Sequence, residues 1–186
     1  MKEVTDLGVN FKGIAIGNGW VDPIVQYPQY AEFAYENNLV SETEYHLLQE
    51  GFAACQKIIE TRSWLPALEF CTILTDVILG NPLKPHFNVY DIREGCDSPP
   101  LCYDMSSSDE FLNRDYIQEK LNNNPSRKWV ECSNPVHIML LGDWLVNLAP
   151  KISAVLESNL QVLVYSGDKD FICNWRGGEA WTKAVE

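Results

Sequence analysis

The chain has 186 residues, of which 46% are hydrophobic and 22% charged, a composition typical of a globular protein rather than a disordered one. Its 14 lysines and arginines against 26 acidic residues give a net charge of −12, which argues against partners such as nucleic acid or anionic lipid. No apolar run approaches the roughly 20 residues that a membrane-spanning helix needs.

The six cysteines favour disulfide bonds over a zinc site. None forms a Cys-x-x-Cys pair, and the three histidines (His46, His86 and His137) are scattered along the sequence. An even number of cysteines at these spacings indicates disulfides and therefore an oxidising compartment. The segment 1–7, however, has no apolar signal-peptide core. Either the cysteines are reduced, or the sequence is part of a longer secreted or lumenal chain.

The first predicted element is a strand over residues 11–16. It ends at Gly17-Asn18-Gly19, because the two glycines allow a sharp exit of the backbone. Asp22-Pro23 and Pro28 predict that the next segment is non-helical at first. Three large aromatic residues lie in it: Trp20, Tyr27 and Tyr30. They either line a pocket or pack in the core, and both interpretations stay open at this point.

Two helices and two disulfides are predicted next. Ser41-Glu42-Thr43-Glu44 has the spacing of a capping box, so a helix should begin near Ser41. The residues of its apolar stripe are Tyr45, Leu48, Phe52, Cys55 and Ile59. A second helix carries Leu68, Cys71, Thr75 and Ile78 and ends near Gly80-Asn81-Pro82. Cys55 and Cys71 lie on the apolar faces of the two helices and could bridge them, and the proline-stiffened loop Cys96–Cys102 indicates a local disulfide.

Further helices are predicted in the second half of the chain. Ser106 to Ser108 form a polar break, after which Tyr116, Ile117 and Leu121 mark a helix that stops at residues 122–125. Residues 136–148 hold Ile138, Leu141, Leu145 and Leu148 at helical spacing. Pro150 opens another helix, with Ile152, Val155 and Leu156 on its buried face, and Asn174 caps a last one that runs through Trp181.

Between these last two helices, residues 162–165 predict a strand buried on both faces, followed by the acids Asp168 and Asp170. Ligands of open α/β sheets sit outside the carboxyl ends of the strands, so one acid could orient a catalytic histidine. An acid-rich turn that bonds its own backbone is the equally good alternative. The predicted fold class is α/β, with residues 1–21 and 150–186 in the core and residues 22–149 as a mostly helical insertion.

Five ordered segments resemble the serine carboxypeptidase family. They are Ile16-Gly17-Asn18-Gly19-Trp20-Val21-Asp22-Pro23, Asn88-Val89-Tyr90-Asp91-Ile92-Arg93, Phe111-Leu112-Asn113-Arg114, Gly142-Asp143-Trp144 and Val164-Tyr165-Ser166-Gly167-Asp168-Lys169-Asp170. The resemblance implies a partial α/β-hydrolase sheet with a helical cap insertion. It also implies release of C-terminal residues from peptides or proteins by a Ser-Asp-His triad, without a metal or other cofactor. Asp170, the second acid of its motif, would be the triad aspartate, and Asp168 a turn residue.

The same resemblance assigns further roles. It implies that the pocket for the side chain preceding the cleaved bond is lined by Trp20, Tyr27, Tyr30, Trp144, Ile172 and Cys173. It implies the disulfides Cys55–Cys71 and Cys96–Cys102, with Cys132 pairing to an upstream cysteine outside this chain. A lysosomal, vacuolar or secreted parent protein is expected, and a homodimer is an oligomeric state to test.

Two members of the triad have no counterpart in this sequence. No Gly-x-Ser-x-Gly motif occurs, and all three histidines precede Asp170. The sequence therefore predicts a central fragment of a carboxypeptidase that hydrolyses nothing when expressed alone. A carboxypeptidase-like acyltransferase and a non-catalytic binding protein on the same scaffold are the alternatives.

Overall fold

The computed structural model describes residues 8–99, 101–123 and 127–185. Segment 1–7, whose sequence lacks a signal-peptide core, lies outside the described residues. Residues 124–125, the last two positions at which the sequence predicts a helix to stop, lie outside them as well.

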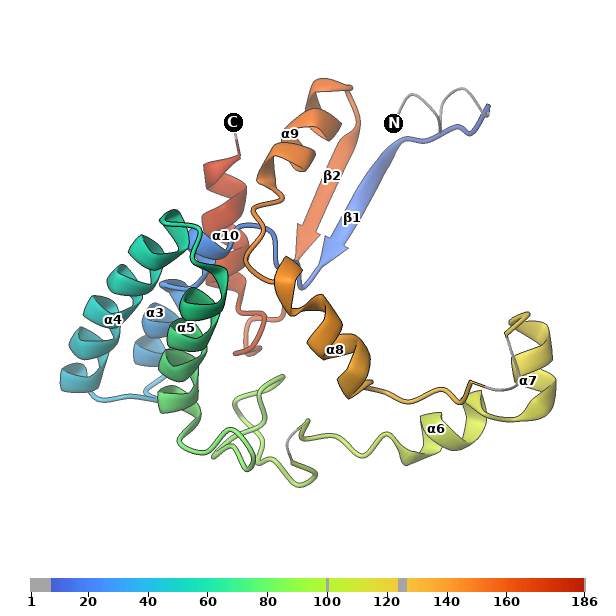
Figure 1. The fold of residues 1–186 in the computed structure, drawn as a ribbon, viewed down its shortest axis with the longest axis horizontal. Helices are drawn as coiled ribbons and strands as arrows, with labels where there is room; N and C mark the ends of the chain where they lie inside the picture. The colour runs from blue at the N-terminus through green and yellow to red at the C-terminus, as the bar shows by residue number, and fades with distance from the viewer. Residues whose placement is uncertain (1–7, 100, 124–126, 186) are drawn as a thin grey trace.

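Two short strands from opposite ends of the chain form a parallel pair (Figure 1). Strand β1 (Gly13–Gly17) lies beside β2 (Gln161–Tyr165), in a register that pairs Gly13 with Gln161 and Gly17 with Tyr165. Helix α9 (Ala149–Glu157) leads into β2, and α10 (Trp175–Ala184) follows it. Most of the helices lie in the long connection between the strands, so the predicted α/β class with a mostly helical insertion is confirmed.

The prediction that the second strand is buried on both faces is wrong for this chain. Val162 and Val164 are half-buried and pack with Ile152 and Trp181 of the flanking helices. Leu163 and Tyr165 point to the opposite face and are 60% and 58% exposed. In helix α9, which precedes the strand, Ile152 is buried as predicted, whereas Leu156 is exposed. The apolar run could not distinguish these faces, because burial on the second face depends on what packs against it.

Helices begin soon after β1, which corrects the prediction of a non-helical segment. Helix α2 (Pro23–Gln26) starts directly after Asp22, whose carboxylate accepts a hydrogen bond from the amide of Ile24. Pro28 immediately precedes α3 (Gln29–Glu36), a helix that the pattern did not predict. Proline is well suited to the first turn of a helix because an amide hydrogen is unpaired there in any case. Here the prolines open helices instead of preventing them.

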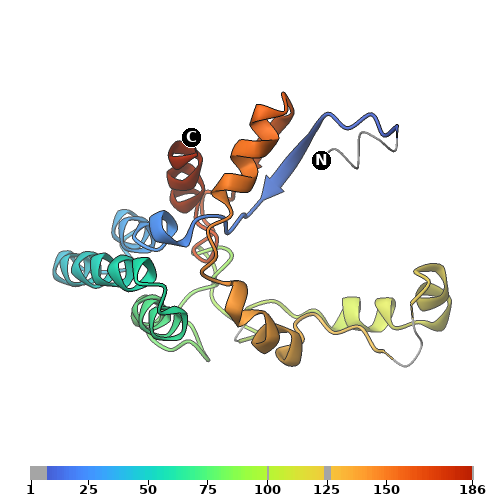
Figure 2. The ribbon, with the colours of Figure 1, turned by 45° about the horizontal axis from the view of Figure 1, so that its top comes forward.

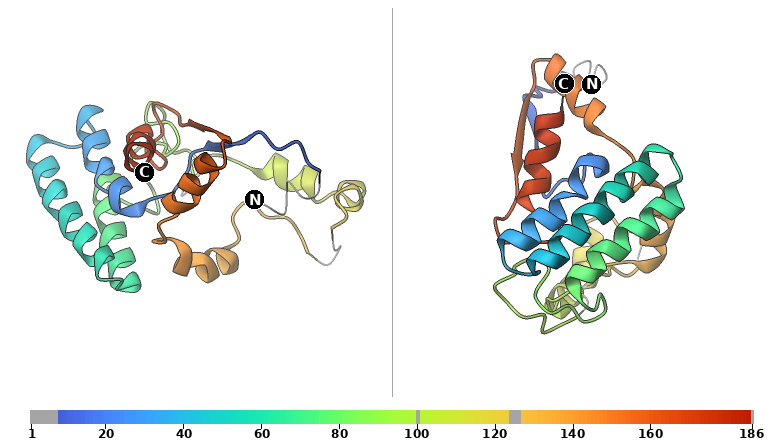
Figure 3. Two further views of the ribbon diagram at one scale, coloured as in Figure 1. Left: turned by 90° about the horizontal axis from the view of Figure 1, so that it is seen from above. Right: turned by 90° about the vertical axis from the view of Figure 1, so that its left-hand side faces the viewer.

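The helix pair α4 (Glu42–Glu60) and α5 (Trp64–Leu79) follows the predicted pattern closely (Figure 3). Ser41 and Glu44 form the full capping box at the start of α4. The stripe residues Leu48, Phe52, Cys55 and Ile59 are all buried. The structure joins Cys55 to Cys71 of α5, and Cys96 to Cys102 further along the chain, so the prediction of disulfide bonds is confirmed.

Residues after the second disulfide form an arm that extends away from the rest of the molecule (Figures 1 and 2). It carries α6 (Ser106–Leu112) and α7 (Asp115–Lys120). Ser106 to Ser108, predicted as a polar break, are in fact the first turn of α6. The predicted helix over 136–148 is shorter than its pattern: α8 (Asn134–Leu140) continues into a single turn, η1 (Leu141–Asp143), and Ile138 is exposed while Leu145 is buried.

Two findings concern the chain as a whole. Cys132 is an exposed free thiol, so its predicted partner outside the chain stays a prediction. Throughout the described segments, every helix falls short of the combined length and apolar character that a bilayer crossing requires.

Candidate active site

The ends of the two strands bring Asn18 and Asp170 together, although they are 152 positions apart in the sequence. Because β1 and β2 are parallel, their carboxyl ends meet at one edge of the sheet. Asn18 has a φ of 55°, in the left-handed region that asparagine tolerates, and its amide donates to the carbonyl of Tyr165 at 3.0 Å. This turn directs its side chain at Asp170, and Asn18 Nδ2 donates to Asp170 Oδ2 at 2.6 Å.

The two acids after β2 lie in different environments. Asp168 is exposed and sits in a turn, whereas Asp170 is 6% exposed. Asp170 Oδ1 accepts a hydrogen bond from the amide of Cys173 at 2.9 Å. Burial raises the pKa of the Asp170 carboxyl group, and the hydrogen bonds from Cys173 and Asn18 offset only part of that rise. Of the two acids, Asp170 is therefore the one held rigidly at the sheet edge.

A turn formed by residues 88–94 fixes the backbone on both sides of Asp170. The amides of Phe171 and Ile172 both donate to the carbonyl of Val89, at 3.0 and 3.1 Å, and the amide of Ile92 donates to the carbonyl of Lys169 at 3.0 Å. The turn itself is held by Asn88, which is 1% exposed and accepts from the amide of Tyr90 at 2.9 Å. The Asn88 segment thus supports the segment that carries the acid.

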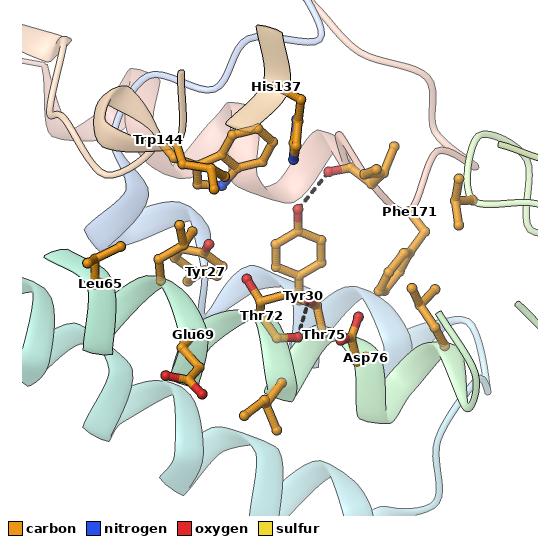
Figure 4. A pocket seen from close by; sticks show the side chains of 16 residues that line it. Tyr27, Tyr30, Leu65, Glu69, Thr72, Thr75, Asp76, His137, Trp144 and Phe171 are labelled. Atoms are coloured by element: carbon orange, nitrogen blue, oxygen red, sulfur yellow. Dashed lines mark hydrogen bonds between the residues drawn. The ribbon is translucent and has the colours of Figure 1, made fainter. Parts of the chain in front are cut away.

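A cavity of about 750 Å³ opens next to this segment. Figure 4 shows its arrangement: side chains of α5 form one wall, Trp144 and His137 lie opposite, and Phe171 closes one end. The volume falls within the range of small-molecule and side-chain binding pockets. Its lining is mostly apolar and aromatic, with polar atoms at a few positions.

Four of the six residues predicted to line a pocket do so: Tyr27, Tyr30, Trp144 and Ile172. The Tyr30 hydroxyl donates to the carbonyl of Ile172 at 2.7 Å, which ties the centre of the pocket to the Asp170 segment. Burial raises the pKa of Tyr27 to about 12 and that of Tyr30 as well, so both hydroxyls stay protonated.

The other two predicted residues lie outside the lining. Trp20 is behind it: its indole packs edge-on against Tyr27 at 5.0 Å between ring centroids, and its Nε1 donates to the carbonyl of Trp144 at 2.8 Å. Cys173 lies beside Asp170, where burial and then the nearby carboxylate raise the pKa of its thiol to about 11. A thiol with that pKa is protonated at neutral pH, which makes it a weak nucleophile.

The sequence prediction missed the α5 wall of the pocket. Its polar members are Glu69, Thr72, Thr75 and Asp76. Glu69, Thr72 and Asp76 recur at intervals of three and four, so they share one face of the helix. That spacing was a usable signal, but it normally marks a solvent-facing surface. The position of α8 and η1 opposite α5 turns this face into a pocket wall.

No described histidine completes a catalytic pair with Asp170. Its side-chain and backbone partners are those given above. His137 lies on the pocket wall against Trp144, and His46 contacts Gln49 on α4. His86 packs against Gly80, at the end of α5. Over the same described ranges, no three histidine, cysteine, aspartate or glutamate side chains converge closely enough to hold a metal ion.

Comparison with known proteins gives a consistent result. A family model described as serine carboxypeptidase, Peptidase S10, matches residues 1–186. Serine carboxypeptidase-like 47 of Arabidopsis thaliana is 35% identical, over 97% of this chain and 36% of its own length. Serine carboxypeptidase 3 of Hordeum vulgare (barley) is 33% identical, over 96% of this chain and 35% of its own length.

A solved structure is similar as well. Kex1(delta)P, described as a prohormone-processing carboxypeptidase from Saccharomyces cerevisiae, superimposes with a TM-score of 0.74 at 25% identity, over 94% of this chain and 40% of that one. The chain thus spans about a third of the length of the Arabidopsis and barley relatives.

Proposed function

Because this chain belongs to the serine carboxypeptidase family, as its motifs predicted, we propose that it supplies the acid and the side-chain pocket of a serine carboxypeptidase. Asp170 is the aspartate of the Ser-Asp-His triad in this proposal, and the cavity around Tyr30 receives the side chain that precedes the cleaved bond. The placement of Asp170 carries the proposal: it is buried at the sheet edge, and its neighbours Phe171 and Ile172 line the pocket.

The chemistry follows from how Asp170 is held. An ionised carboxylate can accept about four hydrogen bonds, and its bonds from Asn18 and Cys173 leave capacity for a histidine N–H. The aspartate then orients the imidazole and stabilises its positive charge while the histidine takes the proton of the attacking serine. The buried position of Asp170 strengthens that stabilisation, because water screens the charge less there.

Several expectations remain part of this proposal. They are the division into a core (1–21 and 150–186) and an insertion (22–149), C-termini of peptides or proteins as substrates, and homodimerisation. The two disulfides support an oxidising location, namely the lysosome, the vacuole or the exterior of the cell. The absence of a Gly-x-Ser-x-Gly motif and of a histidine after Asp170 supports the expectation that these 186 residues alone hydrolyse no peptide.

A chimera tests the proposal directly. The matching segment of barley serine carboxypeptidase 3 is replaced by this chain, so that the relative contributes the serine and the histidine. We expect the chimera to release C-terminal residues from acylated dipeptides. Asp170→Asn should lower kcat by about 10⁴-fold, and Asp168→Asn, its matched control, should change kcat by less than about twofold.

The outcome is interpretable only for a folded chimera. Its cooperative thermal unfolding and its two intact disulfides are checked first, and the barley serine is labelled with a serine-directed inhibitor. A folded, disulfide-bonded chimera without activity would overturn the proposal, and so would an Asp170→Asn variant with unchanged kcat. Inhibitor-sensitive release of C-terminal residues by the 186-residue chain alone would contradict its expected inactivity.

A further inference from the structure

We propose that Asp76 is a specificity-determining residue and that the pocket selects a basic side chain, lysine or arginine, at the position preceding the cleaved bond. This inference rests on the proposed function for the position of the substrate, but the selection of a cation by the pocket can be measured without any hydrolysis.

Among the residues that the structure describes, Asp76 is a charged group without a partner. Its carboxylate lies on the pocket wall, half-buried, and forms no hydrogen bond or ion pair with any residue that the structure describes. Burial raises the pKa of its carboxyl group, and no neighbour in the described part of the chain offsets the rise. The Asp76 carboxylate is thus partly desolvated, and a positive charge that pairs with it would compensate for that loss of hydration. A cationic ligand would provide that charge.

The charge of the whole lining points the same way. The sixteen described residues that line the pocket include two carboxylates, Glu69 and Asp76, and neither a lysine nor an arginine. In Figure 4, Asp76 lies at the Phe171 end of the pocket and Glu69 at the Leu65 end. Phe171 follows Asp170 in the chain, so Asp76 is at the end nearer the proposed catalytic acid. Glu69 is exposed to solvent whereas Asp76 is half-buried, so a bound cation gains more by pairing with Asp76 than with Glu69.

The walls also suit a lysine or arginine better than a small cation. The aliphatic stem of either side chain can pack along the apolar lining while its charged end pairs with Asp76. Trp144, which is 41% exposed in the lining, adds attraction for a cation over its indole face. A leucine or norleucine side chain would fill the same space but would bury Asp76 further without neutralising it. The pocket should thus prefer a charged side chain to an uncharged one of the same length.

The test uses the 186-residue chain and two matched ligands, Nα-acetyl-lysine methylamide and Nα-acetyl-norleucine methylamide. Their side chains have similar length and differ in the ammonium group. Binding is followed by NMR titration and by the tryptophan fluorescence to which Trp144 contributes. We expect the lysine ligand to bind at least about tenfold more tightly than the norleucine ligand. Asp76→Asn should remove most of that difference, and Glu69→Gln, at the other end of the pocket, should retain it.

Each outcome decides the matter. Equal affinity for the two ligands, or a lysine preference that persists in a folded Asp76→Asn variant, would overturn the inference. If Glu69→Gln abolishes the preference for the lysine ligand and Asp76→Asn does not, then Asp76 is not the specificity-determining residue. The charge reversal Asp76→Lys should shift the binding preference to Nα-acetyl-glutamate methylamide. A melting temperature equal to that of the parent chain shows that this variant is folded. Because no hydrolysis is measured, failure here leaves the proposed function standing, and an inactive chimera leaves the cation selectivity standing.

Discussion

The helix pair α4–α5 and the strand pair β1–β2 are stabilised in different ways. The helices surround a core that includes fully buried Phe33, Phe52 and Ala67, and a disulfide joins them. The strands have one face covered by Ile152 and Trp181 and the other face exposed at Leu163 and Tyr165. The helical part therefore contains most of what it needs for stability, whereas the strand pair depends on contacts along a single face. Asp170, the acid proposed for catalysis, follows the second of these regions and is held by Asn18 and by the turn of residues 88–94.

The largest expected effect is in the helical core. Phe52 is completely buried on α4, with its ring 6.3 Å from those of both Tyr27 and Tyr30. Phe52→Ala should cost about 3–5 kcal/mol of unfolding free energy, because it removes a large buried ring and leaves a cavity. Leu47→Ala, on the exposed side of the same helix, is the control and should cost less than about 1 kcal/mol. Urea denaturation followed by circular dichroism compares the two, and equal losses would refute the difference between the two faces of α4.

Removal of the disulfides should cause the second-largest loss of stability. The bond Cys55–Cys71 closes 16 residues and Cys96–Cys102 closes 6. In the chain-entropy account, the longer loop contributes about 3 kcal/mol and the shorter about 2 kcal/mol. We therefore expect Cys55→Ala/Cys71→Ala to lower stability more than Cys96→Ala/Cys102→Ala, and to loosen α4 and α5 in particular. Hydrogen exchange of the helix amides checks the location of the effect. A larger loss from the second pair would show that the short loop, and not the helix pair, limits stability.

The strand pair can be tested with two adjacent residues. Val164 faces Trp181 and its neighbours, and Leu163 faces away from them. Val164→Thr keeps the shape and the β-branch but places a hydroxyl in an apolar contact, at a cost of about 1–3 kcal/mol. Leu163→Thr should change stability by no more than about 0.5 kcal/mol. If the two substitutions cost the same in thermal unfolding, the assignment of a covered and an open face is wrong.

The same contrast explains how much of the structure the sequence could predict. The start of α4 depends on Ser41 and Glu44, and the end of α5 on Gly80, all of which are local signals. The open face of β2 and the pocket role of Asp76 depend on which segments pack nearby, and no local pattern carries that information. Helix α3 was missed for another reason, since Pro28 was interpreted as a helix breaker and not as a helix start. The choice of Asp170 over Asp168 came from the family resemblance, because two acids two residues apart look alike until the turn that carries them is known.

The smallest expected effect on stability is at Asp170, where a substitution should stabilise the folded chain instead of destabilising it. Burial raises the pKa of Asp170, so ionisation of this carboxyl group opposes folding at neutral pH. Asp170→Asn removes the charge and can keep both hydrogen bonds, if the Asn18 amide turns to accept from the new side chain. The variant should be more stable at pH 7, and each 1 kcal/mol gained should raise the melting temperature by about 2–4 °C.

The pH dependence separates this effect from improved packing. Above the raised pKa only the parent chain carries the buried charge, and the stabilisation by asparagine is complete. As the pH falls through that pKa toward the ordinary value near 3.9, Asp170 takes up its proton and the difference between the two proteins should vanish. Melting temperatures measured from pH 7 to pH 3.5 test this, with Asp168→Asn as the exposed control that should show no such trend. A stability gain that is independent of pH would mean that the charge of Asp170 costs nothing in the folded chain. If the gain disappears in acid, the ionised side chain of the residue proposed for catalysis lowers the stability of the folded chain that holds it.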